Sequence, residues 1–148
     1  MTRTTTALAI AAVLFAGLAL SRLLPSDALV SAPETAQGSG ESTAMVEVAL
    51  PAEFSGNGRI GKTIFEAKCA ACHGPNAAGQ DGVAPPLVHK IYEPSHHSDA
   101  AFLLAAQNGV RSHHWRFGDM PPVEGVTQGD VTMVTAYVRE LQRANGIN

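Results

Sequence analysis

The residues with the clearest chemistry are two cysteines and a histidine at close spacing. Cys69 and Cys72 are the two cysteines of the 148-residue chain, and His73 directly follows the second. The order Cys-x-x-Cys-His is the attachment sequence for c-type haem. Two thiols at this spacing can each add to one vinyl group of the porphyrin, and the adjacent imidazole is then brought onto the iron from one face. The motif therefore predicts one covalently bound haem c.

Other uses of a cysteine pair fit this chain less well. A thioredoxin-like redox pair needs a βαβ context, whereas this segment sits in a helical pattern. A zinc site needs two further ligands at zinc spacing. A structural disulfide remains open in an exported protein, but the adjacent His73 and the export signal described below favour haem attachment.

Three helical segments must position this motif. Apolar residues recur at helical spacing over residues 58–70, 99–108 and 128–144, with Asn57, Ser98 and Thr127 as the expected N-caps and Gly109 as a stop signal. Thr127 and Asp130 also match a Thr-x-x-Asp capping pattern. No strong strand pattern is present. Loops as long as those between these helices are uncommon in a compact domain unless they are functional.

The N-terminal part of the chain predicts export. Arg3 precedes an apolar run of 14 residues, Ala7 to Leu20, which is the order of an export signal. The run is short for a membrane span, yet Leu23 and Leu24 extend it, so residues 1–24 are expected to be an export signal or an N-terminal membrane anchor. Low bulk and no periodicity predict a flexible linker over residues 25–56. The folded domain is then expected over residues 57–148.

Residues 57 to about 143 resemble the small monohaem cytochromes c that have a His/Met-ligated iron. Gly61 and Phe65 stand eight and four residues before Cys69, as in the first helix of that family. Tyr137 lies in the last predicted helix, where the family places an aromatic residue that packs against this glycine. The resemblance implies an all-α cytochrome c fold, with three to four helices wrapped around one haem.

Two further points of resemblance concern the iron ligands. In the family, the carbonyl of a proline at the position of Pro85, twelve residues after His73, accepts the N–H of the proximal imidazole. Residues 118–122 read Gly-Asp-Met-Pro-Pro and resemble the loop that carries the family's distal methionine. The resemblance therefore implies His73 and Met120 as the axial ligands.

Other residues rival Met120 as the second ligand. His113 and His114 stand six and seven residues before it, and ligation by a second imidazole would lower the potential of the iron. Met133 falls inside the last predicted helix and is expected in the core, and Met45 falls in the predicted linker.

Five histidines remain beyond the haem motif: His89, His96, His97, His113 and His114. A histidine in a loop is usually solvated or bonded to backbone. Imidazole and thioether ligands together suit copper. However, adjacent residues rarely point the same way, and no carboxylate or thiol completes a geometry, so the sequence does not favour a second metal.

The haem propionates need partners, because a buried anion is costly without them. The indole N–H of Trp115 and the guanidinium of Arg116 are suitable donors, and we expect one of them to bond a propionate. Arg111 fits this role and that of a solvated surface charge about equally well.

Charge and ligation together indicate the class of function. Residues 57–148 hold eight basic and eight acidic side chains, which gives no basic patch for nucleic acid. Two protein ligands on the iron leave no open position, so the resemblance implies a one-electron carrier rather than an enzyme. Transient redox proteins are the expected partners. The periplasmic side of a bacterial membrane is the implied location, with the chain released or tethered to the inner membrane by residues 7–24.

Two other functions stay open at this stage. One is a ligand-binding or peroxidatic cytochrome whose sixth ligand is labile or a histidine. The other is a haem subunit of a larger membrane complex. The sequence does not identify the electron donor or the electron acceptor.

Overall fold

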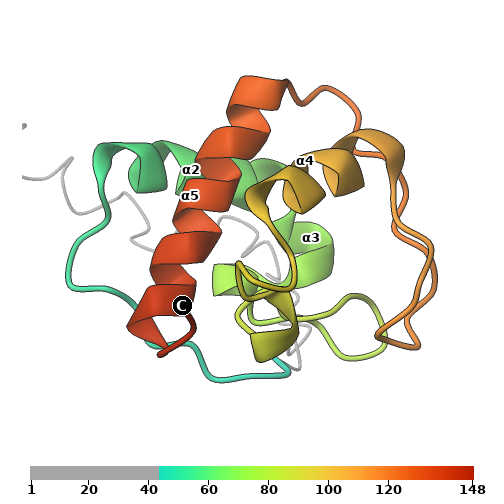
Figure 1. Ribbon diagram of the computed structural model, residues 1–148, viewed down its shortest axis with the longest axis horizontal. Helices are drawn as coiled ribbons and strands as arrows, with labels where there is room; N and C mark the ends of the chain where they lie inside the picture. Colours follow the sequence, from blue (N-terminus) through green and yellow to red (C-terminus); the bar gives the residue numbers. More distant parts are fainter. Residues whose placement is uncertain (1–43) are drawn as a thin grey trace, which may run out of the picture. The chain divides into compact units, whose positions relative to one another are not determined.

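The computed structural model describes residues 44–148, which are organised around helices (Figure 1). The α-helices are α2 (Gly56–Lys68), α3 (Ala70–His73), α4 (Asp99–Asn108) and α5 (Gln128–Ala144), and the short 3-10 turns are η1 (Pro75–Ala77) and η2 (Lys90–Tyr92). Within residues 44–148 no strand forms, and two isolated β-bridges join Gln80 to Ala84 and Val110 to Met120. The all-α prediction is therefore confirmed.

The described part holds no membrane span. None of the helices within residues 44–148 is long and apolar enough to cross a bilayer. The predicted export signal or anchor, residues 1–24, lies outside the described residues. The same holds for residues 25–43 of the predicted linker.

The end of the predicted linker lies against the helices. The backbone N–H groups of Met45 and Val46 donate to the carbonyl of Ala78 over 3.1 and 3.2 Å. Ala49 exchanges two hydrogen bonds, each of 2.9 Å, with the side-chain amide of Asn145. The folded chain thus begins ahead of residue 57, the boundary that the sequence predicts. Side chains of this segment pack as well, because Val48 and Phe54 lie against the core and the ring of Phe54 is 5.2 Å by centroid from that of Tyr137.

α2 begins two residues earlier than the sequence predicts. Its N-cap is Ser55 rather than Asn57, and the Ser55 hydroxyl accepts a hydrogen bond from the N–H of Gly58 over 3.1 Å. Glu140 of α5 holds this cap, because its carboxylate accepts from the backbone N–H of Ser55 over 2.9 Å and from the hydroxyl over 2.5 Å. A contact from a distant helix therefore decides which of two good capping residues is used.

α2 and α5 cross at a glycine (Figure 1). A Cβ atom on Gly61 would overlap the backbone carbonyl of Met133 and lie 3.0 Å from the Cβ of Tyr137. Only a residue without a side chain permits this approach. Beside the crossing, the fully buried rings of Phe65 and Tyr137 pack with centroids 5.5 Å apart. The glycine–aromatic contact implied by the resemblance is present.

A buried arginine joins α5 to the segment before α4. Arg139 is 6% exposed, and its guanidinium donates to the carboxylate of Asp99 over 2.8 Å. It also donates to the backbone carbonyls of Tyr92 and His97. A buried charge needs such partners. Arg139 thereby fixes the backbone of residues 92–97, a segment without a helical or strand pattern in the sequence.

The predicted bounds of α4 and α5 match those observed. Ser98 precedes α4 and Gly109 ends it with a φ of 73°. At the start of α5 the N–H of Thr127 donates to the carboxylate of Asp130 over 2.8 Å, and the N–H of Asp130 donates to the Thr127 hydroxyl over 3.1 Å. This reciprocal pair is the capping box that the sequence predicts.

Candidate functional site

The Cys-x-x-Cys-His motif forms a single helical turn at the end of α2. The N–H of Cys69 donates to the carbonyl of Phe65 over 2.8 Å and closes α2. The N–H groups of Cys72 and His73 then donate to the carbonyl of Cys69 over 3.1 and 2.9 Å. This turn, α3, places the two sulfurs and the imidazole on the wall of one cavity.

That cavity has a volume of about 860 Å³. This size falls in the range of small-molecule and cofactor sites, about 300–1,000 Å³. Its wall is mostly apolar and comes from α2 to α5 and from the loop between α4 and α5; it includes Ile64, Phe65, Leu87, Phe102, Leu104, Val110, Val123, Val131 and Val134. Few protein side chains fill the interior between these elements, which suits a large bound group.

A hydrogen bond fixes the ring of His73. Its Nδ1 lies 2.9 Å from the carbonyl oxygen of Pro85, so Nδ1 carries the proton and Nε2 is left with its lone pair. Burial lowers the pKa of His73, and the bond to Pro85 offsets part of this. The imidazole is therefore neutral at neutral pH, as a ligand must be.

Two glycines bring Pro85 back to His73. Gly79 has a φ of 75°, and its N–H donates to the carbonyl of His73 over 2.7 Å. A Cβ on Gly79 would lie 2.5 Å from the backbone nitrogen of Pro86. Gly74, with a φ of 71°, would in turn place a Cβ 2.5 Å from the carbonyl oxygen of Gly79. The close return of this loop therefore depends on residues without side chains.

Met120 lies on the same cavity wall and is held by its backbone. Its N–H donates to the carbonyl of Val110 and its carbonyl accepts from the N–H of Val110, both over 2.9 Å. Gly109 makes room for this pairing, because a Cβ there would lie 2.5 Å from the carbonyl oxygen of Met120. The end of α4 thus anchors the predicted Met-Pro loop at its methionine.

The other candidates for the second iron ligand lie in different parts of the structure. His113 and His114 also line the cavity, so the structure brings both kinds of candidate ligand to one place. Met133 lies in α5 and is half-buried, and its carbonyl faces Gly61 at the helix crossing. Met45 lies in the segment that packs on Ala78.

Of the three residues considered as hydrogen-bond donors to a propionate, one lines the cavity and two do not. Trp115 lines the cavity, and its indole Nε1 is buried without a hydrogen-bond partner among the described residues. Burial raises the pKa of the Tyr92 phenol, and the nearby indole N–H of Trp115 offsets part of this increase. The two groups do not meet the geometry of a hydrogen bond. Arg116 and Arg111 are exposed and are not among the residues of the wall.

The residues of this cavity fit a covalently bound haem. Both thiols are free, and the neutral imidazole of His73 lies beside them. The buried indole N–H of Trp115 has no hydrogen-bond acceptor among the described residues, and a haem propionate could provide one. The thiol of Cys69 does not suit redox exchange, because burial, and then the neighbouring Cys72, raises its pKa to about 11. Reactive dithiols instead have depressed pKa values.

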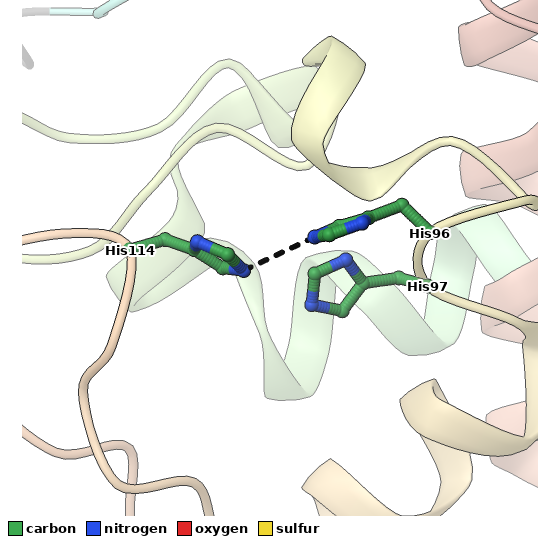
Figure 2. A group of neighbouring side chains, drawn as sticks. All are labelled: His96, His97 and His114. Carbon is green, nitrogen blue, oxygen red and sulfur yellow. Dashed lines mark hydrogen bonds between the residues drawn. The ribbon is translucent and has the colours of Figure 1, made fainter.

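One cluster near the cavity is not evident from the sequence. His96, His97 and His114 each offer a ring nitrogen, and these nitrogens lie within 4.8 Å of one another (Figure 2). Contrary to the expectation that adjacent histidines point apart, the rings of His96 and His97 lie 4.8 Å apart by centroid and both face His114 (Figure 2). Two loops meet at this point, and sequence spacing alone does not show that meeting.

Comparison with known proteins identifies the family. The family model described as Cytochrome c matches residues 59–142. No curated protein and no solved structure matches the chain closely enough to count as a relative. The matched range covers more than half of the chain and includes α3, α4 and most of α2 and α5. The chain therefore belongs to the cytochrome c family, whose members are electron-transfer haem proteins.

Proposed function

We propose that this protein is a monohaem c-type cytochrome that carries one electron at a time between protein partners. Cys69 and Cys72 would attach the haem through thioether bonds, and His73 and Met120 would bind its iron. When bound, the haem supplies the Fe(III)/Fe(II) couple.

The observation that carries this proposal is the meeting of the motif and Met120 on one cavity. His73 and Met120 belong to different elements, α3 and the loop after α4, and both line the same apolar space. A neutral imidazole and a soft thioether together favour the reduced iron and raise its potential. With both positions taken by protein, neither substrate nor dioxygen finds an open site.

The chain's own groups prepare this site for electron transfer. The Pro85 carbonyl fixes the His73 tautomer, and the backbone pairing with Val110 fixes Met120. A rigid ligand set keeps the rearrangement between oxidation states small. The apolar wall excludes water, and Trp115 offers its N–H to a propionate.

The partner surface that we propose is the apolar rim of the cavity. Leu104 and Val83 both line the cavity, yet they are 56% and 43% exposed. Exposed apolar residues at the edge of a cofactor site suit small, transient redox contacts. We propose that this contact forms on the periplasmic side of a membrane, with residues 1–24 as export signal or anchor. We propose redox proteins as partners, not nucleic acid, and name no particular electron donor.

A second candidate function rests on the histidines of the cavity wall. His113 and His114 lie on the wall beside Met120, and either could compete for the iron. A labile or histidine sixth ligand would make the protein a ligand-binding or peroxidatic cytochrome. A haem subunit of a membrane complex would keep His73 and Met120 as the iron ligands and would differ in its protein partners.

Two measurements test the proposed function. Stepwise reduction of the full-length protein, followed by haem absorption, should give one reversible transition with a slope of one electron. Carbon monoxide added to the reduced protein at neutral pH should leave that spectrum unchanged, because no coordination position is open. Rapid carbon monoxide binding, or turnover of peroxide, would instead support the ligand-binding cytochrome.

A further inference from the structure

Four imidazoles gather where two loops meet. His96 and His97 come from the segment before α4, and His113 and His114 come from the loop that runs to Met120. Ring centroids are 4.2 Å apart for His113 and His114 and 5.3 Å apart for His96 and His114. Figure 2 shows His96 and His97 reaching toward His114 from the facing loop.

We propose that His96, His97 and His114 form a binding site for a divalent transition-metal ion, Zn²⁺ or Cu²⁺, beside the haem cavity. The proposal goes beyond electron transfer, and the metal is separate from the haem iron. Imidazole is the ligand that these ions share, whereas Mg²⁺ and Ca²⁺ prefer oxygen ligands.

The distances between the ring nitrogens suit such an ion. A metal–nitrogen bond of about 2.0–2.1 Å in a tetrahedral site places neighbouring ligand nitrogens about 3.3–3.4 Å apart. Nε2 of His96 and Nε2 of His114 lie 3.4 Å apart, and the whole set spans 4.8 Å. Rotation of two exposed side chains, His96 and His114, supplies the remaining closure of about 1.5 Å.

The third ring is oriented from behind, as metal-binding imidazoles usually are. Nδ1 of His97 lies 2.6 Å from the carbonyl oxygen of Ile91, so Nδ1 carries the proton and Nε2 keeps its lone pair. Arg139 donates to the carbonyl of His97 itself and fixes its backbone. A buried guanidinium and a backbone carbonyl therefore set the direction of this ring.

The spacing of the rings also favours their neutral form, because the ring centroids lie 4.8 Å apart for His96 and His97 and 5.3 Å apart for His97 and His114. Several protonated imidazoles at these spacings would repel one another. Neutral imidazoles avoid the repulsion and leave lone pairs available.

The alternative is that the cluster binds no metal ion. The 3.4 Å separation of His96 and His114 also suits a hydrogen bond between two neutral rings. In that case the cluster only joins the two loops. Metal binding and ring-to-ring bonding differ in stoichiometry and in the response to an added ion, so titration distinguishes them.

The direct test titrates the full-length haem-containing protein, without an affinity tag of histidines, with ZnCl₂ at pH 7.5. Calorimetry and metal analysis after gel filtration should give one Zn²⁺ per chain. His114→Ala and His97→Ala should each weaken binding at least tenfold, the range known for lost support of a metal ligand. His89→Asn is the matched control, because His89 lies outside the three-nitrogen set and Asn can keep its cap on Ile91 N–H.

A second probe needs no variant. One equivalent of CuCl₂ added to the wild-type protein should give an electron paramagnetic resonance spectrum with coupling to three nitrogens. His113→Ala should leave the zinc stoichiometry at one. Loss of binding in His113→Ala but not in His96→Ala would overturn the assigned ligand set.

Three results would overturn the site itself. Wild-type protein that binds no zinc leaves the cluster as a ring-to-ring hydrogen bond. Unchanged binding in His114→Ala, with an unchanged haem spectrum that shows correct folding, places the ion elsewhere. A changed haem spectrum of metal-free His114→Ala would place this imidazole on the iron, and this outcome would reject Met120 as the axial ligand as well.

Discussion

Nδ1 of His73 lies 2.9 Å from the carbonyl oxygen of Pro85, twelve residues further along the chain. The contact ties the haem motif to a loop that must fold back sharply on itself. Its strength depends on the close approach of Gly79 to Pro86, where a Cβ would lie 2.5 Å from the backbone nitrogen. The ligand that the motif supplies is therefore oriented by a loop that carries no ligand.

Gly79→Ala should destabilise the haem-containing protein by the strain of its φ and by about 1–3 kcal/mol more, the usual cost of forcing an atom into a packed site. The matched control is Gly82→Ala, because Gly82 has the same φ of 75° but a Cβ there would meet nothing within 4 Å. The control should lose only the strain of its φ, about 1 kcal/mol. Urea denaturation followed at the haem band measures both, and equal losses would reject the packing argument.

Arg139→Met should lower the free energy of unfolding by about 1–3 kcal/mol, because the backbone carbonyl of His97 loses its donor, whereas the carboxylate of Asp99 is 73% exposed and can be solvated. Arg139→Lys should recover only part of this loss, since an ammonium cannot reproduce the fork of a guanidinium. Thermal and urea denaturation of both variants provide the measurement. Wild-type stability in Arg139→Lys would show that charge alone matters at this position.

Trp115→Phe should lower the midpoint potential of the haem and destabilise the protein by about 1.5–3 kcal/mol, the range for a lost hydrogen bond to a charged group. The buried indole N–H has no partner among residues 44–148, and we expect it to meet a propionate. Without that donor the negative charge acts fully on the iron and favours Fe(III). The measurement is a redox titration at pH 7.

The matched control for Trp115→Phe is Phe117→Leu, because the rings of Phe117 and Trp115 stack with centroids 5.8 Å apart. This variant disturbs the stacking and keeps the N–H. Equal shifts of potential in the two variants would assign the effect to packing and reject the propionate contact.

Local patterns in the sequence reveal some parts of this protein and not others. The Cys-x-x-Cys-His turn, α4, α5 and the Thr127–Asp130 capping box depend on residues close together in the chain, and the sequence predicts all of them. It favours Asn57 over Ser55 as the cap of α2, because the deciding contact comes from Glu140, 85 residues from Ser55. The clustering of His96 and His114 depends on two loops that meet across 18 residues, which no local pattern encodes.

Acid should weaken the start of α5 through Asp130. Hydrogen bonds from the backbone and hydroxyl of Thr127 lower the pKa of this carboxyl below its ordinary value of 3.8. A carboxyl group whose pKa is lowered by folding contributes its full stabilisation at pH values above its ordinary pKa. This contribution is lost as the pH falls through the folded-state pKa. Asp130→Asn should therefore remove part of the acid sensitivity below about pH 4.

Urea denaturation between pH 2 and pH 7 measures this effect, with Asp81→Asn at an exposed loop position as the control. The stability gap between wild type and Asp130→Asn should narrow as the pH falls. A gap that stays constant across this range would show that the carboxylate charge contributes nothing to the cap.

The central claim is that His73 and Met120 both bind the haem iron, and the ferric absorption spectrum tests it most directly. Ligation by methionine gives a weak charge-transfer band at long wavelength. The wild-type protein should show this band, and Met120→Ala should lose it while the haem stays attached through Cys69 and Cys72. Absence of the band from the wild type, or its survival in Met120→Ala, would contradict the account.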